Sequence, residues 1–191
     1  ALASLHLGNG SSLSAVKDGK CQDTSMGLTP LEGLIMGTRC GSCDPAVVQF
    51  IANNDKKSVD EVLTMMNKQS GLLGIGGKSD MRDKDAILAR DMLIYGIQKY
   101  IGSYMAALQG ADAIIFTAGI GENNAHLRQR VIEGFGYMGI KLDEAKNEAC
   151  TAPNVKETII STPDSTVKVI VIPTNEEIMI ARDTLELVEK A

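Results

Sequence analysis

The chain has 191 residues, of which 44% are hydrophobic and 23% charged, and its formal net charge is −5 at pH 7. This length and composition exclude disorder as the main state and suffice for one good-sized domain or two small ones. The acidic balance argues against nucleic acid and anionic membranes as partners, and no apolar run approaches the ~18 residues that span a bilayer.

Hairpin signals divide the first part of the chain into extended runs. Asn9-Gly10 and Asp18-Gly19 are typical of type I′ turns, in which both central residues adopt positive φ. The sequence therefore predicts an antiparallel meander of three strands, at residues 2–7, 12–17 and 20–25.

Residues 26–45 form a Gly- and Pro-rich loop, in which one short helical turn is expected near Leu31–Met36. Helical patterns begin after this loop. The second helix should begin at a capping box formed by Ser58 and Glu61. Residues 70–80 contain too much glycine for long regular structure. Helices are expected over residues 46–53, 59–68, 83–109, 124–133 and 144–150, and from 175 onward. One face of the longest helix carries Ile94, Ile97, Ile101, Tyr104 and Leu108.

The apolar run Ala113–Thr117 has the length of a strand and should be buried on both faces. It stops at a glycine turn, residues 119–121, which leads into the next helix. A further strand is expected over Val167–Ile172, and Thr174 with Glu177 fits a capping box for the last helix. The stripe on that helix, interpreted as core packing, consists of Ile178, Ala181, Leu185 and Val188. Three antiparallel strands followed by alternating helices and strands indicate one α/β domain on a mixed sheet.

The segment from His6 to Ser12 is the first candidate site. A turn as bare as this one, with Gly8 and Gly10, exposes consecutive backbone N–H groups that can bind phosphate oxygens. Ser11 and Ser12 add hydroxyl donors, and His6 at the strand end can donate to an anion. A plain tight turn is the alternative interpretation.

The segment Thr117–Asn123 is the second candidate, because it joins a buried strand to a helix N-terminus. Backbone can approach a nucleotide closely there, and the helix end favours anionic or polar groups. The segment matches neither G-x-G-x-x-G nor a P-loop. A purely structural turn is the alternative.

Two charged residues are further candidates. Arg39 lies in a glycine-flanked loop with little to pair with except Asp44, and its planar guanidinium suits phosphoryl oxygens. A solvated surface charge is the alternative. Glu176 is left over by the predicted capping box and, facing a phosphate site, is a candidate metal ligand through water.

The four cysteines are Cys21, Cys40, Cys43 and Cys150. Cys40 and Cys43 form one C-x-x-C pair, but no second pair or H-x-x-x-H follows, and a four-ligand site would need distant partners. Zinc and a catalytic redox pair are therefore both disfavoured. Reduced thiols are expected, together with a cytoplasmic location, since residues 1–5 also lack the basic region of a signal peptide.

Six motifs, in this order, resemble the C-terminal domain of the acetate kinase family, within the superfamily of sugar kinases, heat-shock proteins and actin. They are HLGNGSS at 6–12, DTSMGLTPLEGLIMGTR at 23–39, SGLLGI at 70–75, SDMRD at 79–83, FTAGIGEN at 116–123 and PTNEE at 173–177. The resemblance covers essentially the whole chain. It implies a ribonuclease H-like (actin-like ATPase) fold, with residues 1–191 as the nucleotide-binding C-terminal half of a two-domain kinase.

The resemblance also implies roles for individual residues. Arg39 would stabilise the transferring phosphoryl group, Glu176 would hold Mg²⁺, and Pro30 would form one wall of the pocket for the acetate methyl group. The nucleotide-binding positions would be His6, Leu7, Gly8, Asn9, Gly10, Asp80, Met81, Arg82, Gly119, Ile120, Gly121, Glu122 and Asn123.

The chain departs from the family pattern in two respects. The family usually continues its arginine loop as Ser-Gly-Asp-Ile-Asp-Pro, where this sequence has Cys40-Gly41-Ser42-Cys43-Asp44-Pro45. The N-terminal half of the family has no counterpart here. In the family that half supplies an asparagine, a second arginine, a catalytic aspartate, a histidine and most of the acetate pocket.

The implied activity is reversible phosphoryl transfer from ATP to acetate, which gives ADP and acetyl phosphate and uses Mg²⁺. The family forms homodimers through its C-terminal domains. Tyr95, Tyr100 and Met105 give the long helix more apolar residues than one face can bury, although packing within the domain explains them equally. Propionate or butyrate is the alternative acceptor. For this chain alone, a non-catalytic nucleotide-binding and dimerisation module is the alternative function.

Overall fold

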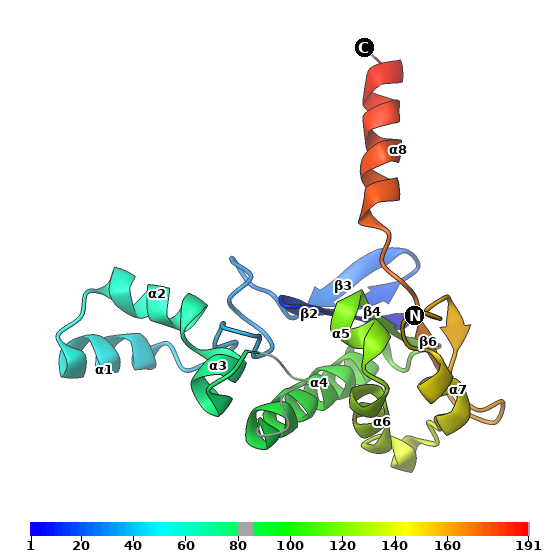
Figure 1. Cartoon of the computed structure of the whole chain (residues 1–191), viewed down its shortest axis with the longest axis horizontal. Coiled ribbons are helices and arrows are strands. Elements are labelled where there is room, and N and C mark those ends of the chain that lie inside the picture. Colours follow the sequence, from blue (N-terminus) through cyan, green and yellow to red (C-terminus); the bar gives the residue numbers. More distant parts are fainter. Residues whose placement is uncertain (80–85, 191) are drawn as a thin grey trace.

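The computed structural model describes residues 1–79 and 86–190 (Figure 1). Within these residues, six strands form one mixed sheet in the order β3-β2-β1-β4-β6-β5. The strands are β1 (Leu2–Leu7), β2 (Ser11–Lys17), β3 (Lys20–Thr24), β4 (Ala113–Thr117), β5 (Thr158–Ile159) and β6 (Lys168–Val171). The α/β class, the mixed sheet and the opening meander are thus confirmed, while the sequence pattern did not indicate β5.

The two hairpins of the meander use different turns. Asp18 and Gly19 have φ of 52° and 73°, so the predicted type I′ turn is confirmed between β2 and β3. Neither Asn9 nor Gly10 has a positive φ, so the same prediction is wrong for the first hairpin. Its turn spans residues 8–10 and is closed by the N–H of Gly8, which donates to the carbonyl of Gly10 at 3.0 Å.

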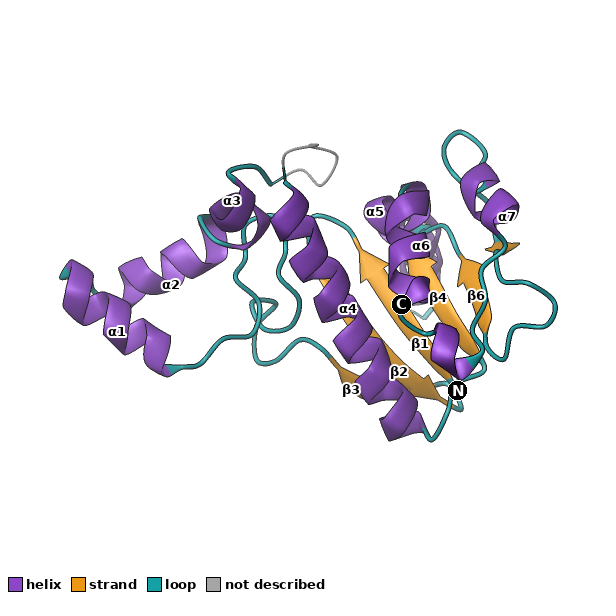
Figure 2. Cartoon of the chain, turned by 90° about the horizontal axis from the view of Figure 1, so that it is seen from below, coloured by secondary structure: helices purple, strands orange, loops and turns teal. Residues whose placement is uncertain are grey.

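β1, β4 and β6 run parallel, and only one face of this part of the sheet is fully buried. In β4, Ile114 and Phe116 are buried, whereas Ala113, Ile115 and Thr117 are only partly buried. The expectation of burial on both faces is therefore wrong. The helices α4 and α6 both lie over the same face of the sheet (Figure 2).

The buried face packs against α4 (Ile87–Leu108) and α6 (Ala125–Glu133). All five residues of the predicted apolar face of α4 are buried, which confirms that face, and Met105 joins the core as well. The Tyr104 hydroxyl donates to the carbonyl of Leu13 at 3.1 Å and so ties α4 to β2, and burial raises the pKa of that hydroxyl. The predicted start of the helix at Asp83 lies outside the described residues.

A helical arm extends from the sheet (Figure 1) and consists of α1 (Ala46–Asp55), α2 (Val59–Lys68) and the short α3 (Gly71–Gly76). The capping box of Ser58 and Glu61 is present, as predicted. The helical turn expected near residues 31–36 is absent. Gly33 has a φ of 107° there, and both its N–H and its carbonyl bond to Ser42, so this stretch is held as a loop.

The second half of the chain differs from expectation at the turn after β4. Ala118 has a φ of 64°, and α5 (Ala118–Asn123) begins at once, where an irregular glycine turn was expected. Asn124 then caps α6 by accepting from the N–H of Leu127 at 2.9 Å. A 3₁₀ turn (Gly136–Met138) and α7 (Glu144–Ala149) follow.

The last helix, α8 (Glu176–Glu189), projects away from the rest of the chain (Figure 1). None of its residues is buried, and Ile178, Leu185 and Val188 are 46%, 58% and 68% exposed. Their interpretation as core packing is therefore wrong. Among the helices that the structure describes, none combines the length and the apolar character that crossing a bilayer requires.

Candidate functional site

The candidate segments meet at one edge of the sheet, where the parallel strands β1, β4 and β6 end. Residues 8–10 follow β1, residues 118–123 follow β4, and residues 172–176 follow β6. Ligands of open α/β sheets bind in the crevice outside the carboxyl ends of such strands. The strand order therefore brings together motifs that lie more than a hundred residues apart in the sequence.

His6 lies near the end of β1, on the partly exposed face of the sheet. The register pairs His6 with Ser12 on β2 and with Thr117 on β4, so three polar side chains form a row across the strands. Leu7 points to the opposite face and is 1% exposed, so only its backbone can serve a ligand. The Ser11 hydroxyl is buried and donates to the carbonyl of Gly8 at 3.1 Å, so it is not the free donor expected from the sequence.

The hairpin turn lies close to both neighbouring loops. A methyl group added at Gly8 would lie 3.7 Å from Cβ of Ala118, and one added at Gly10 would lie 3.4 Å from Nη1 of Arg39. One added at Gly37 would lie only 2.8 Å from Oδ1 of Asn9. The absence of side chains thus allows the three loops to approach one another.

Arg39 is the cation of this cluster. Its Nη1 donates to the carbonyl of Pro30 at 3.4 Å and lies 3.5 Å from Sδ of Met36, so the structure brings Arg39 and Pro30 together. Asp44, the acid expected from the sequence to pair with Arg39, accepts from the N–H of Ala46 at 2.9 Å. A partly exposed guanidinium beside bare backbone is suited to bind phosphoryl oxygens.

The backbone of Arg39 is fixed from behind by α3. Gly71 has a φ of 60°, and a methyl group there would lie 2.1 Å from the Met36 carbonyl oxygen and 2.5 Å from that of Arg39. The Arg39 carbonyl also accepts from the N–H of Met36 at 3.0 Å. The conformation of the arginine loop therefore depends on glycine at position 71.

Three predicted nucleotide contacts, Asp80, Met81 and Arg82, lie outside the described residues. The residue before them, Ser79, is described. Its Cβ and carbonyl oxygen would each lie 3.6 Å from a methyl group at Gly37, the glycine that contacts Asn9. The chain therefore reaches the hairpin at the point where this predicted segment begins.

The segment Gly119–Asn123 offers backbone more than side chains. Glu122 accepts from the N–H and hydroxyl of Thr174 at 2.8 and 2.9 Å, and Asn123 bonds to the carbonyl of Gly119 and the N–H of Ala152. Nothing lies within 4 Å of a methyl group at Gly119, so this part of the turn faces open space.

The Glu122–Thr174 contact also corrects the predicted start of α8. Thr174 does not form a capping box with Glu177, because its hydroxyl and N–H are bound to Glu122. Asn175 caps the helix instead, accepting from the N–H of Ile178 at 3.2 Å. The contact joins the loop after β4 to the loop after β6.

Sequence reasoning missed Arg128, a fully buried residue of α6 that supports the turn after β4. Its guanidinium donates to the carbonyls of Gly121 and Glu122 at 2.9 and 2.6 Å, and to the side chain and carbonyl of Asn147 and the carbonyl of Cys150. Burial lowers the pKa of this guanidinium. Its signal in the sequence is weak, because an arginine on an amphipathic helix is usually assigned to the exposed face.

We expect Arg128→Lys to lower the free energy of unfolding by about 1–3 kcal/mol, because an ammonium cannot reach all of these acceptors and leaves buried carbonyls unsatisfied. Urea denaturation measures the change. Arg130→Lys is the matched control, since Arg130 is 42% exposed and pairs with Asp91 at the surface. Equal midpoints for the two variants would contradict the supporting role of Arg128.

Glu176 stands at the start of α8, directly after the loop that Glu122 holds. Within residues 1–79 and 86–190, no cluster of three or more His, Cys, Asp and Glu could hold a metal ion by itself. Mg²⁺ commonly binds through one or two carboxylates, several waters and substrate phosphates. A single exposed carboxylate at this edge fits an ion of that kind, one shared with a phosphorylated ligand.

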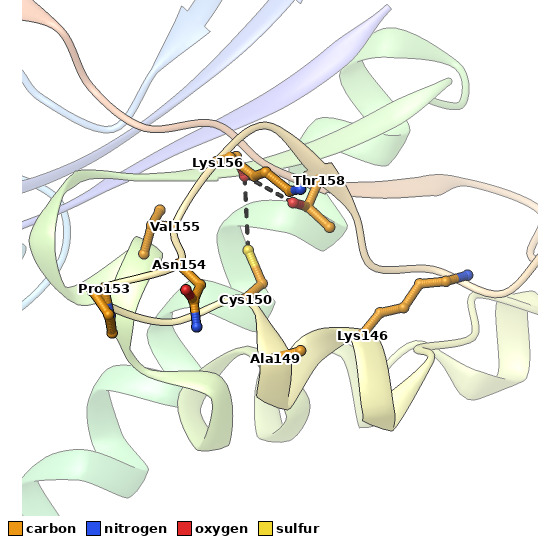
Figure 3. Close-up of a pocket in the computed structure, with 8 residues that line it drawn as sticks. All are labelled: Lys146, Ala149, Cys150, Pro153, Asn154, Val155, Lys156 and Thr158. Atoms are coloured by element: carbon orange, nitrogen blue, oxygen red, sulfur yellow. Dashed lines mark hydrogen bonds between the residues drawn. The ribbon is translucent and has the colours of Figure 1, made fainter.

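A hollow of about 580 Å³ lies elsewhere, between α7 and the segment that leads from it to β5 (Figure 3). Two of its polar groups are bound to one carbonyl, because Cys150 Sγ and Thr158 Oγ1 both lie against the Lys156 carbonyl oxygen, at 3.8 and 2.9 Å. Lys146 is paired with Asp143 at 2.9 Å. The hollow contains none of the predicted site residues, so we place the candidate site at the strand edge.

Comparison with known proteins identifies the family of this chain. The family model described as the acetokinase family matches residues 1–182. The acetate kinase of Clostridium novyi (strain NT) is 56% identical to this chain, with 99% of this chain and 49% of that protein covered. The acetate kinase of Methanosarcina thermophila is 53% identical, with 96% and 47% covered.

Solved structures give the same result. The crystal structure of Porphyromonas gingivalis acetate kinase matches with a TM-score of 0.90 at 42% identity, covering 98% of this chain and 49% of that one. A propionate kinase from Francisella tularensis matches with a TM-score of 0.86 at 45% identity, covering 94% and 47%. The expected actin-like ATPase fold is thereby confirmed, and the chain spans about half the length of the curated relatives that it matches.

Proposed function

Because the chain belongs to the acetokinase family, we propose that it supplies the nucleotide-binding half of an enzyme that transfers a phosphoryl group from ATP to acetate. The reaction is reversible and gives ADP and acetyl phosphate. One observation carries the proposal: the hairpin after β1, the turn after β4 and the loop of Arg39 converge at one sheet edge.

The residues at this edge have the properties that phosphoryl transfer requires. The transition state carries charge on the equatorial oxygens of the transferring group, so positioning and charge neutralisation dominate catalysis. Arg39 would neutralise that charge. The backbone of residues 8–10 and His6 would bind the phosphates, and the turn at 119–123 would lie beneath the adenosine, which residues 80–82 are predicted to contact.

Glu176 would hold Mg²⁺ through water, together with the nucleotide phosphates. A bound Mg²⁺ would neutralise negative charge on the phosphate oxygens. Pro30, whose carbonyl accepts from Arg39, would place an apolar wall next to the guanidinium. Within the described residues, the proposed contribution of the chain to catalysis thus rests on the guanidinium of Arg39, the carboxylate of Glu176 and backbone donors at a single edge.

The size of the acyl group is open between acetate and longer acids. The match to a propionate kinase has almost the same TM-score as the match to an acetate kinase. One methylene in an apolar pocket changes the free energy of discrimination by only about 1–3 kcal/mol. Of the predicted acetate pocket, this chain contributes Pro30 alone, so propionate or butyrate is the second candidate for the acceptor.

The proposal predicts that the chain binds ATP or ADP with Mg²⁺ weakly and saturably, because most nucleotide contacts are present and the closing half is not. Isothermal titration calorimetry measures the binding. Gly37→Ala should weaken it, since the new methyl group would lie 2.8 Å from Asn9 Oδ1 and displace the hairpin.

Gly102→Ala is the matched control for this titration. It adds the same methyl group in α4, where nothing lies within 4 Å, and alanine favours a helix over glycine. Absence of saturation at millimolar nucleotide by the folded parent chain would contradict the proposal. Equal affinities for the two variants would remove Asn9 from the nucleotide site.

We further propose that the remaining half of the protein packs against α8, whose apolar side chains are uncovered. The large exposed residues of this helix are Ile178, Met179, Ile180, Leu185, Leu187 and Val188. Burial of such side chains is worth roughly 1.5–3 kcal/mol each. The relatives, being about twice as long, have chain available to cover them.

A homodimer through this domain is the proposed assembly. Leu88, Met92 and Tyr95 are 64%, 43% and 64% exposed and recur at helical spacing on α4, so they form an apolar stripe opposite the core face. Tyr100 and Met105, in contrast, pack within the domain. Light scattering at tens of micromolar should give twice the mass of one chain, and the mass of a single chain would contradict the dimer.

The four free thiols and the use of ATP support a cytoplasmic location.

A further inference from the structure

The C-x-x-C pair of the arginine loop has no role in the proposed phosphoryl transfer. Cys40 follows Arg39 directly and is partly buried, while Cys43 is exposed. Both thiols stand where the family pattern has residues without sulfur. We propose that Cys40 and Cys43 are a thiol modification site, which closes to a disulfide by exchange with a low-molecular-weight disulfide.

The backbone between the two cysteines is already held in a closed turn. Gly41 has a φ of 70°, and a methyl group there would lie 2.7 Å from the carbonyl oxygen of Gly33. Ser42 exchanges two hydrogen bonds with Gly33, through its N–H at 2.9 Å and its hydroxyl oxygen at 3.1 Å. The N–H of Cys40 donates to the carbonyl of Met66 at 2.9 Å. Little conformational entropy therefore remains to be lost when the turn is cross-linked.

Cys40 and Cys43 stand three positions apart, on either side of Gly41 and Ser42 in this turn. Burial raises the pKa of the Cys40 thiol to about 11, and interaction with Cys43 adds to the rise. The Cys40 thiol also lies 3.1 Å from the Gly41 carbonyl oxygen, to which it donates. Cys40 is thus a poor first nucleophile. Cys43 is exposed, so its thiol reacts first with a small disulfide in solution.

The exchange proceeds in two steps. The thiolate of Cys43, its proton released to solvent, attacks one sulfur of the small disulfide, whose S–S bond breaks and whose other half leaves as a thiol. Cys40 then gives up its proton and attacks Sγ of Cys43, and the second small thiol leaves. Two protein thiols are oxidised to one disulfide, and one small disulfide is reduced to two thiols.

Peptide mapping of the full chain tests the proposal. Trypsin cleaves after Arg39 and Lys56, so one peptide, 40–56, holds both cysteines, while Cys21 and Cys150 fall in other peptides. After treatment with oxidised glutathione, peptide 40–56 should lack the mass of two hydrogen atoms. An alkylating reagent should not modify its two cysteines until dithiothreitol has reduced the disulfide.

Single substitutions separate the two steps. In the Cys40→Ser variant, the exchange with oxidised glutathione should stop at the mixed disulfide, with one glutathione on Cys43, because the second thiol is absent. Cys21→Ser removes an exposed cysteine outside the loop and should behave as the parent does. Alkylation of both cysteines in the treated parent, or parent protein that keeps glutathione on Cys43 without closing, would overturn the proposal.

A consequence for turnover rests on the proposed function, because the disulfide fixes the residues directly after Arg39. The complete protein, oxidised and checked by mapping, should turn over more slowly and recover with dithiothreitol, whereas Cys43→Ser should not respond. Equal rates before and after verified oxidation would overturn this coupling to Arg39. A failure of nucleotide binding by the reduced chain would count instead against the proposed function.

Discussion

Replacing Arg39 with alanine in the complete protein is expected to lower kcat about 10²- to 10³-fold while the KM for nucleotide changes little. Removing one preorganised donor from a developing charge typically costs about 2.7–4 kcal/mol of transition-state stabilisation. The structure favours such a role because Nη1 of Arg39 lies beside Gly10 of the first hairpin and against the Pro30 carbonyl. A contact made mainly in the transition state lowers kcat and kcat/KM together.

Two control variants sharpen this experiment. Arg39→Lys keeps the charge but loses the planar fork, so it should recover only part of the rate. Arg130→Ala removes a cation whose partner is the surface residue Asp91, and its kcat should match that of the parent. An unchanged kcat for Arg39→Ala, measured with saturating nucleotide and acetate, would remove this residue from the mechanism.

Local signals predicted the elements of the fold well where a single physical cause acts over a few residues. The capping box of Ser58 and the buried face of α4 were both correct, because hydrogen bonding at a helix start and helical periodicity are local. Asn9-Gly10 shows the limit of this reasoning. The same dipeptide chemistry that forms a type I′ turn at Asp18-Gly19 gives a different turn here, where the loops of Arg39 and Ala118 crowd the hairpin.

Long-range contacts explain the remaining errors. Thr174 fits a capping box by spacing, but Glu122, fifty-two positions earlier, binds both its hydroxyl and its N–H. Arg128 gave little signal in the sequence, because its partners come from α5 and α7. The apolar stripe of α8 follows helical spacing, yet no described part of this chain covers it, so the local pattern led to the wrong assignment to the core.

The candidate site was predictable in its motifs but not in its arrangement. Nothing in the spacing of His6, Arg39 and Gly119 requires them to share an edge. The parallel pairing of β1 with β4 brings the loops after His6 and Thr117 together, and the close approach at Gly10 adds Arg39. Register also adds Ser12 and Thr117 beside His6, a row that only the pairing of strands defines.

The isolated chain is expected to show no measurable acetate kinase activity even while it binds nucleotide. Formation of an acyl phosphate requires the carboxylate of acetate in line with the γ-phosphoryl group at close distance, and such positioning supplies ~7–11 kcal/mol of the barrier. Pro30 is the one predicted acetate contact in this chain, and its apolar ring cannot orient a carboxylate.

The open side of the site lowers the rate further. Arg39 and His6 would face the transferring group from this half alone, with both side chains partly exposed. Water on the other side weakens their electrostatic interaction with the phosphoryl group and competes as a nucleophile, so trace ATP hydrolysis is the most that we expect.

A hydroxamate assay on the purified chain, compared with the complete two-domain protein, measures this difference. Addition of the missing half as a separate polypeptide is the decisive control, because it should restore turnover if it covers α8 and closes the site. Turnover by the isolated chain within tenfold of the complete protein would show that these 191 residues hold every catalytic group. In that case, the assignment of the acetate-orienting groups to the other half would be wrong.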